Sequence, residues 1–350
     1  MPTLKIISYN FPASLDRQIP GEGGHLRIAA NSYVTTGIDT KNNDGKISLI
    51  FAHATGFHKE LWNPIIKLLH ERRHRWNGGD MWSLDCSNHG DSAMLNQDIL
   101  PEKFVWSDFA RDILQLIDEA KIQKPIIGIG HSFGGTSMLM AEIFRPGTFA
   151  SILVIEPILR PTVLDVFELT YTTVTKRRDK WPDREAAHAN FSKSKFFQSW
   201  DPEMLNLYVY TFFYDKSDQH STFHQMSKIQ CPTLFVVGDN SNFDYQDLAL
   251  HKISQCQHSE LISVDAGHLV PMEKPAQMAY IIEYFARKSS KNNVLQTNQP
   301  EDNNLRPNIK WIILLFKLLM GIETIYEEDL EHLKRLESFE SYGNVDVNND

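Results

Sequence analysis

The chain has 350 residues, of which 42% are hydrophobic and 11% aromatic, enough for a substantial buried core. Its formal net charge of −9 is concentrated at one end, because residues 323–350 carry nine acidic and two basic side chains. That segment has a net charge of −7, which leaves −2 for the rest of the chain and argues against a nucleic-acid-binding surface.

Cysteine usage and hydropathy bear on the compartment. Cys86, Cys231 and Cys256 show neither CxxC spacing nor the even number expected of a disulfide framework. The N-terminus has no apolar run long enough for a secretory signal, and the apolar segment 311–322 is shorter than the ~20 residues of a membrane span. We therefore expect reduced thiols and a soluble intracellular protein.

The elements alternate in type along the chain. Residues 1–45 alternate weakly in polarity and end in the turn signal TKNNDGK, which indicates an antiparallel hairpin region. Uniformly apolar runs then predict buried strands at 47–53, 81–86, 125–130, 151–157, 231–239 and 259–268. Helical spacing predicts helices at 58–71, 106–120, 134–144, 243–254 and 274–288. This pattern is typical of the α/β class, with a mostly parallel central sheet flanked by helices on both faces.

The segment 158–230 interrupts this alternation with helical patterns and many aromatic side chains. Open α/β sheets bind ligands at the carboxyl ends of their strands. We therefore interpret the segment as a helical cap over that edge, inserted into a core made of 1–157 and 231–288. An ordinary extra helical layer is the alternative.

The C-terminal part changes in composition. Residues 289–310 are rich in Asn and Gln, which predicts a flexible linker, and 311–350 is predicted to be an apolar helix followed by an acidic tail. The segment 311–322 has two interpretations: it packs on the body or on a partner protein, or it lies peripherally on a membrane surface.

The stretch PIIGIGHSFGGT places a serine between glycines at the end of a predicted strand. Residues 130–134, Gly-His-Ser-Phe-Gly, match G-x-S-x-G, in which a nucleophilic Ser132 would occupy a strained strand-to-helix turn. Side chains two positions before and after the serine would collide with neighbouring backbone. A tight connection without chemistry is the alternative, but the strand before and the helix after Ser132 favour catalysis.

A serine nucleophile needs a base and an acid that orients it. His268 ends the last predicted strand, which places it at the same sheet edge as Ser132, although a loop histidine without a catalytic role is the alternative. Two strand ends offer the acid: Glu156 follows ILVI, while Asp239 ends CPTLFVVGD and Asp244 lies in the loop after it. Glu156 is favoured because a buried carboxylate there would otherwise lack a partner.

An acyl-transfer site also needs hydrogen-bond donors for the oxyanion. The backbone N–H of Phe133 is the first candidate, and that of Thr55, in the loop after the first core strand, is the second. The same loop, HATGFHKELW, brings His53, Phe57 and Trp62 to the predicted substrate pocket. We expect His53 to act as a structural hydrogen-bonding group rather than as a base.

Together these motifs resemble the α/β-hydrolase family over residues 47–288. The nucleophile motif stands as GHSFGG, and the oxyanion motif, commonly His-Gly-x, stands as HAT at 53–55. The family's D-x-x-G-H-G-x-S loop stands as DCSNHGDS at 85–92, and its histidine motif as GHLVPMEKP.

The similarity is closer to one fungal subgroup, which contains peroxisomal lipase-like, toxin-biosynthesis and acyl-CoA hydrolases. HATGFHKELW, LDCSNHGDS, EPIL and the cap pattern carry it. In such enzymes the acid can follow the strand after the nucleophile helix, so the resemblance implies Glu156. The chain ends in VDVNND, without a C-terminal peroxisomal tripeptide, which leaves the cytoplasm and the peroxisome as the expected compartments.

We therefore expect a serine hydrolase that cleaves a carboxylic ester or thioester with an apolar acyl group, a small-molecule substrate, and that needs no metal or cofactor. Epoxide or haloalkane hydrolysis normally uses a carboxylate in this turn, which Ser132 disfavours. The non-enzymatic alternative is a catalytically degenerate fold that serves as an interaction or receptor protein.

Overall fold

The computed structural model describes residues 3–16, 26–36, 45–101, 104–159, 181–208, 222–241 and 246–295. The chain divides into two units, Met1–Gln296 and Thr297–Asp350, and all described residues lie in the first. The predicted apolar helix and acidic tail at 311–350 and most of the predicted linker lie outside the described residues, so their roles stay predictions.

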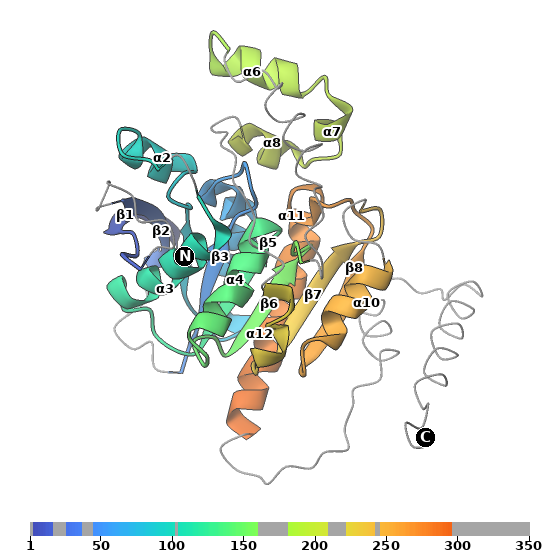
Figure 1. Cartoon of the computed structure of the whole chain (residues 1–350). Helices are drawn as coiled ribbons and strands as arrows, with labels where there is room; N and C mark the ends of the chain where they lie inside the picture. Colours follow the sequence, from blue (N-terminus) through green and yellow to red (C-terminus); the bar gives the residue numbers. More distant parts are fainter. Residues whose placement is uncertain are drawn as a thin grey trace, which may run out of the picture. The chain divides into compact units, whose positions relative to one another are not determined.

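A single eight-stranded sheet runs through the described core in the order β1-β2-β4-β3-β5-β6-β7-β8 (Figure 1). The pairs β1–β2 and β2–β4 are antiparallel, and all pairs from β4 to β8 are parallel. The predicted fold class and N-terminal antiparallel region are thus confirmed. The strands are β1 (Thr3–Pro12), β2 (Arg27–Thr36), β3 (Ile47–Ala52), β4 (Gly78–Leu84), β5 (Ile126–His131), β6 (Ser151–Ile155), β7 (Thr233–Gly238) and β8 (Ser259–Val264).

Helices cover both faces of the sheet. On one face α3 packs on α4, and on the other α1 packs on α12. Alternation along β3 shows the two layers: Ile50 and Ala52 belong to the core beneath α3 and α4, whereas Phe51 between them packs on Trp62. These core elements are η1 (Lys59–Trp62), α1 (Asn63–Glu71), η2 (Arg73–Arg75), α2 (Gly90–Asn96), α3 (Trp106–Glu119), α4 (Phe133–Phe144), η3 (Met226–Lys228), α10 (Gln246–Ser254), α11 (Val270–Glu273) and α12 (Pro275–Leu295).

Four differences from the expected elements bear on the fold. The strand predicted at 259–268 ends at Val264, because the Asp-Ala-Gly turn that follows bends the chain and Ala266 N–H bonds back to Val264. The strand predicted at 81–86 is β4, which begins three residues earlier and ends two earlier. Helix α2 was not expected, since seven residues are too few to show a period.

The fourth difference lies at the end of the core. Helix α12 continues to Leu295, seven residues into the segment predicted as a flexible linker. Ser289 explains part of this extension: it is buried, its hydroxyl donates to the carbonyl of Phe285, and it also bonds Ser151 of β6. A polar residue that reads as linker in the sequence therefore anchors the helix to the sheet.

The described part of the cap forms α6 (Arg184–Phe191), α7 (Lys195–Gln198) and α8 (Pro202–Tyr208), which lie above the sheet in Figure 1. Asp183 caps α6 by accepting the N–H of Ala186. Residues 222–230, predicted as the end of the cap, instead pack into the core through Phe223, Met226 and Ile229. The cap insertion is therefore shorter than the predicted 158–230.

Hydrogen bonds to backbone carbonyls join the described part of the cap to the core. The N–H of Asp201 donates to the carbonyl of Met272 at 2.9 Å, and Nε2 of His58 donates to the carbonyl of Leu207 in α8 at 2.9 Å. No helix in the described ranges is long and apolar enough to cross a membrane.

We predict that Gly134→Ala lowers the free energy of unfolding by about 2–3 kcal/mol. A methyl group at Gly134 would lie 2.5 Å from the carbonyl oxygens of Ala52 and His53, which are backbone atoms and cannot rotate away. Urea unfolding followed by circular dichroism measures the loss. Gly147→Ala is the comparison, because Gly147 has open space around it and a φ of +76°, so alanine there costs only the backbone strain of about 1–2 kcal/mol and makes no clash. Equal losses in the two variants would contradict the close-packing argument.

Candidate active site

Ser132 occupies the turn between β5 and α4. Its backbone has φ 52° and ψ −115°, a left-handed conformation that costs a non-glycine residue about 1–3 kcal/mol. The Ser132 N–H donates to the carbonyl of Ile155 at 2.8 Å, and its carbonyl accepts the N–H of Thr136 at 3.0 Å. The conformation predicted for a nucleophile turn is therefore present and held from both sides.

A chain of hydrogen bonds runs from Ser132 through His268 to Glu156. Nε2 of His268 lies 3.0 Å from Oγ of Ser132, and Nδ1 of His268 lies 3.0 Å from Oε2 of Glu156. His268 reaches this position from the loop after β8, not from the strand itself. The structure therefore brings the predicted nucleophile, base and favoured acid into one constellation.

Glu156 is buried directly after β6, on a backbone with φ 47°. Its Oε1 accepts the N–H of Gly238 at 2.6 Å, and its Oε2 accepts the hydroxyl of Ser241 at 2.6 Å as well as facing His268. Such bonds hold the carboxylate in one orientation. Of the alternative acids, Asp239 is exposed and Asp244 lies outside the described residues.

The two predicted oxyanion donors lie on facing segments. Phe133 is the first residue of α4, so its N–H has no acceptor within the helix. Thr55 lies in the turn 54–57, closed by the Phe57 N–H to the carbonyl of Ala54 at 3.1 Å. The close approach of Gly134 to the end of β3 brings α4 and this turn together.

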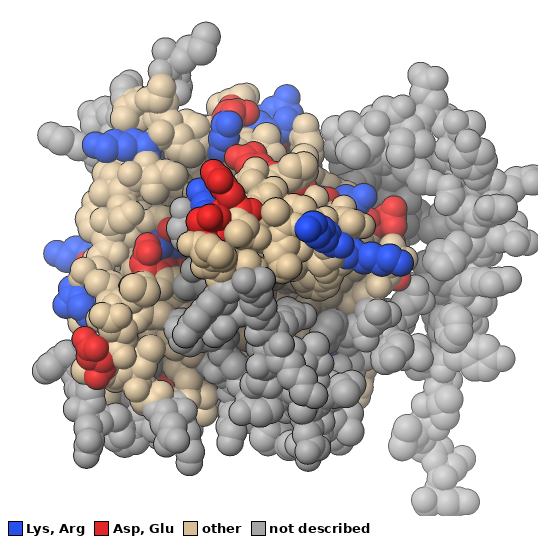
Figure 2. Space-filling view, turned by 90° about the horizontal axis from the view of Figure 1, so that it is seen from above, with Lys and Arg blue, Asp and Glu red and all other residues tan. Residues whose placement is uncertain are grey.

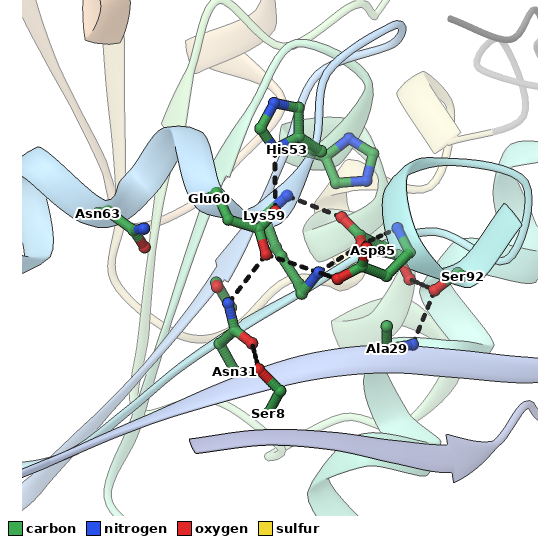
Figure 3. A network of polar contacts seen from close by, with 12 residues as sticks. Ser8, Ala29, Asn31, His53, Lys59, Glu60, Asn63, Asp85 and Ser92 are labelled. Carbon is green, nitrogen blue, oxygen red and sulfur yellow. Dashed lines mark hydrogen bonds and ion pairs between the residues drawn. The ribbon is translucent and has the colours of Figure 1, made fainter. Parts of the chain in front are cut away.

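The loop from His53 to Glu60 is bound to the loop from Asp85 to Asp91 by buried charges (Figure 3). Nζ of Lys59 lies 2.9 Å from Asp85, 2.6 Å from Asp91 and 2.7 Å from Glu60, and the Lys59 N–H donates to Asp85 at 2.7 Å. Burial lowers the pKa of Lys59, but the surrounding carboxylates more than reverse this and raise it. Burial raises the pKa of Asp85 to about 6 against the attraction of Lys59.

The residues predicted for the substrate pocket fall into different places. Phe57 stacks on His131 with ring centroids 6.2 Å apart and meets Trp200 and Tyr208 of the cap edge-on, each at 5.5 Å. Trp62 is buried, and its ring packs on Phe51 in the core. Phe57 therefore lies between the constellation and the cap, whereas Trp62 does not belong to the pocket.

His53 is also withdrawn from any substrate. Its Nδ1 donates to the carbonyl of Ala54 at 2.8 Å, and its Nε2 accepts the N–H of Cys86 at 3.1 Å. Burial lowers the pKa of His53 to about 3, so the ring is neutral. It is the structural hydrogen-bonding group that we expected, and the pocket assignment for it is wrong.

Several residues of the site were missed in the sequence. Nε2 of His131 donates to the backbone carbonyl of His268 at 2.9 Å, and Nε2 of His89 accepts the N–H of Gly56 at 3.0 Å. The motifs that contain His131 and His89 were recognised in the sequence. A hydrogen bond from a histidine side chain to a distant backbone group, however, produces no periodic pattern from which it could be predicted. Ser241 donates a hydrogen bond to Glu156, but in the sequence it lies in a stretch that indicates only a turn.

The cap side of the molecule carries no patch of one charge among the described residues that Figure 2 displays. Lys and Arg side chains alternate there with Asp and Glu, and large uncharged areas separate them (Figure 2).

Comparison with known proteins now fixes the family. A model of the alpha/beta hydrolase family matches residues 49–279, from β3 into α12. The chain belongs to the alpha/beta hydrolase family. The resemblance inferred from GHSFGG and the neighbouring motifs is thereby confirmed.

Relatives with curated descriptions share this region. The chain is 29% identical over 223 residues to a type I acyl-CoA thioesterase, mpaH, of Penicillium roqueforti, a match that covers 58% of this chain and 49% of that protein. It is 24% identical over 224 residues to an abhydrolase domain-containing protein, AFT2-1, of Alternaria alternata, covering 48% of this chain and 85% of the other. The chain thus spans about half the length of the thioesterases that it matches.

A solved structure extends the likeness to the fold. The peroxisomal alpha-beta-hydrolase Lpx1 of Saccharomyces cerevisiae superposes with a TM-score of 0.68 at 19% identity. The superposition covers 98% of this chain and 99% of that one. It shows a shared α/β-hydrolase fold.

Three buried histidines predict acid-sensitive stability. Burial lowers the pKa of His53 and of His131 to about 3, and that of His89 well below its usual 6.5. Below pH 6.5 the unfolded chain binds protons that these rings cannot take up when folded. The free energy of unfolding should therefore fall as the pH falls from 6.5 toward 4, by up to about 4 kcal/mol per pH unit.

Urea unfolding at pH 7.5, 6, 5 and 4 measures this slope. His53→Gln should reduce the slope of the free energy of unfolding against pH by the contribution of one proton, ~1.4 kcal/mol per pH unit. A free energy of unfolding that stays flat between pH 7.5 and 5 would contradict the burial of neutral rings.

Proposed function

We propose that the protein is a serine hydrolase that cleaves a carboxylic ester or thioester through an acyl-enzyme. The observation that carries the proposal is the hydrogen-bond chain of Ser132, His268 and Glu156, with 3.0 Å at each step. Membership of the alpha/beta hydrolase family supports it, because this fold presents a nucleophile at the same strand-to-helix turn.

In the first half-reaction, Nε2 of His268 takes the proton of the Ser132 hydroxyl while Oγ attacks the acyl carbonyl. The carbonyl oxygen becomes an oxyanion, which the N–H groups of Phe133 and Thr55 stabilise. The imidazolium then gives its proton to the departing alcohol or thiol as the bond to the acyl carbon breaks. Glu156 holds the Nδ1–H of His268 and stabilises the transient positive charge.

In the second half-reaction, His268 removes a proton from water, which attacks the acyl-enzyme. The second tetrahedral intermediate collapses, the carboxylic acid leaves, and the proton returns from His268 to Oγ of Ser132. Each proton taken by His268 is returned in the same half-reaction. The catalytic cycle is therefore complete with the residues named here.

One observation supports an apolar acyl group, and a second favours a thioester as the bond that is cleaved. The cap contributes a buried aromatic cluster that contacts Phe57, made of Phe191, Phe197, Trp200 and Tyr208. Apolar walls of this kind select hydrocarbon chains. The curated relatives described as acyl-CoA thioesterases favour a thioester over an oxygen ester.

Ser132→Ala should abolish labelling by a fluorophosphonate probe and hydrolysis of p-nitrophenyl butyrate, while the melting temperature changes by less than a few degrees. The hydroxyl is the only group removed, and alanine has a left-handed backbone cost similar to that of serine. In-gel fluorescence and thermal unfolding measure the two effects. Absence of labelling in the intact chain would remove the enzyme proposal.

The acid has its own test. Glu156→Gln should lower kcat by about 10³–10⁴-fold, because the amide cannot stabilise the imidazolium. Asp239→Asn is the matched control at the end of the neighbouring strand and should retain activity within about twofold, since Asp239 is exposed. A large loss in Asp239→Asn alone would show that the acid has been assigned to the wrong strand.

A further inference from the structure

The turn that carries Thr55 can exist in two forms that differ by rotation of one peptide. Residues 54–57 form a four-residue turn, closed by Phe57 N–H to the carbonyl of Ala54, with φ +76° at Gly56. A positive φ at the third position is the mark of a type II turn, whereas a type I turn has the Thr55–Gly56 peptide rotated the other way. Gly56 permits the type II form, and a hydrogen bond from outside the turn can hold it.

We propose that His89 is a positioning residue for the oxyanion donors: its Nε2 holds the Thr55–Gly56 peptide in the type II form, and its ring supports Phe133. This inference rests on the proposed function, since it concerns the oxyanion formed at Ser132. The Gly56 N–H donates to Nε2 of His89 at 3.0 Å, so the ring holds the very peptide whose rotation separates the two turn types.

The ring of His89 is itself fixed. It is 1% exposed, and its Nδ1 donates to the side-chain oxygen of Asn88 at 2.7 Å, which leaves the lone pair of Nε2 to accept from Gly56. Burial, with a contribution from His53, lowers the pKa of His89 and keeps this neutral form. A protonated ring could not accept the Gly56 N–H.

The ring of His89 also contacts the side chain of Phe133, whose backbone N–H is the other predicted oxyanion donor. It stacks on Phe133 with ring centroids 6.1 Å apart and an interplanar angle of 25°. The loop that carries His89 is anchored by Asp85, whose two oxygens accept the N–H groups of Lys59 and Asp91. His89 therefore couples both predicted oxyanion donors to one rigid support.

Oxyanion donors act only when they point to where the charge develops. A misplacement of about 1 Å can cost on the order of 10²-fold in rate. Loss of the Nε2 acceptor releases the turn 54–57 from the loop that carries His89, so the Thr55 N–H is no longer held in one place, while the binding of the acyl chain is unaffected. The expected signature is a fall in kcat without a matching change in KM.

Two variants separate the nitrogen from the ring. His89→Phe keeps an aromatic ring against Phe133 but removes the acceptor, whereas His89→Gln places a carboxamide oxygen where it can accept the Gly56 N–H. With p-nitrophenyl butyrate, His89→Phe should lower kcat about 10–100-fold with KM within about threefold. His89→Gln should recover at least about tenfold of that loss. Binding of a trifluoromethyl ketone, which forms an oxyanion on Ser132, should weaken in proportion to kcat/KM.

His70→Phe is the matched control. His70 is a buried histidine of α1 that contacts Thr35 near the end of β2, close to the amino end of β4 and therefore at the sheet edge opposite the site. This change should lower the melting temperature while leaving kcat within about twofold. The control distinguishes loss of a buried ring in general from loss of the acceptor at Gly56.

The outcomes separate the two proposals. If the intact chain is labelled by fluorophosphonate and His89→Phe keeps wild-type kcat, the positioning role is overturned and the hydrolase proposal stands. If His89→Gln loses as much kcat as His89→Phe, the acceptor is not what matters and the role is again overturned. An intact chain that is neither labelled nor active overturns both. Should His89→Phe fail to fold, His89→Gln decides alone, and kcat below about a tenth of the wild-type value overturns the role.

Discussion

The close approach of α4 to the end of β3 is the constraint on which the candidate site depends. Gly134 lies where a side chain would meet the carbonyl oxygens of Ala52 and His53, and Gly130 lies equally close to the backbone of Gly134. These contacts press the turn that carries Ser132 against the start of the loop that carries Thr55. The proposed nucleophile and the proposed oxyanion donors therefore come together through backbone packing.

Buried polar bonds then hold the loops that packing has brought together. His53 bonds Cys86, His89 bonds Gly56, and Lys59 bonds both Asp85 and Asp91, so several links join the segments 53–60 and 85–91. Buried ion pairs add little net stability, because desolvation offsets most of their attraction. Their effect here is geometric, because each bond fixes one part of the loop 53–60 against the loop 85–91.

The sequence predicted those parts of the site that local pattern controls. Ser132, His268 and Glu156 each follow an apolar run that ends in a turn, and Glu156 stood out because a carboxylate after ILVI needs a partner. Trp62 and His53 were misplaced, since apolarity and motif membership do not tell on which side of a strand a ring packs. His89, His131 and Lys59 escaped because their partners lie 26 to 137 residues away in the chain, and no periodicity records such bonds.

The ends of the neighbouring strands β6 and β7 contribute differently to the site: one carries Glu156, and the other donates hydrogen bonds to it. β6 and β7 are paired in register, with Ile155 opposite Val236, so both strand ends reach the edge where His268 lies. The β7 end donates the Gly238 N–H and the Ser241 hydroxyl to Glu156. Because these groups orient a carboxylate arriving from β6, the loop after β7 supports the acid instead of supplying it. A carboxylate on that loop is then free to remain at the surface, as Asp239 does.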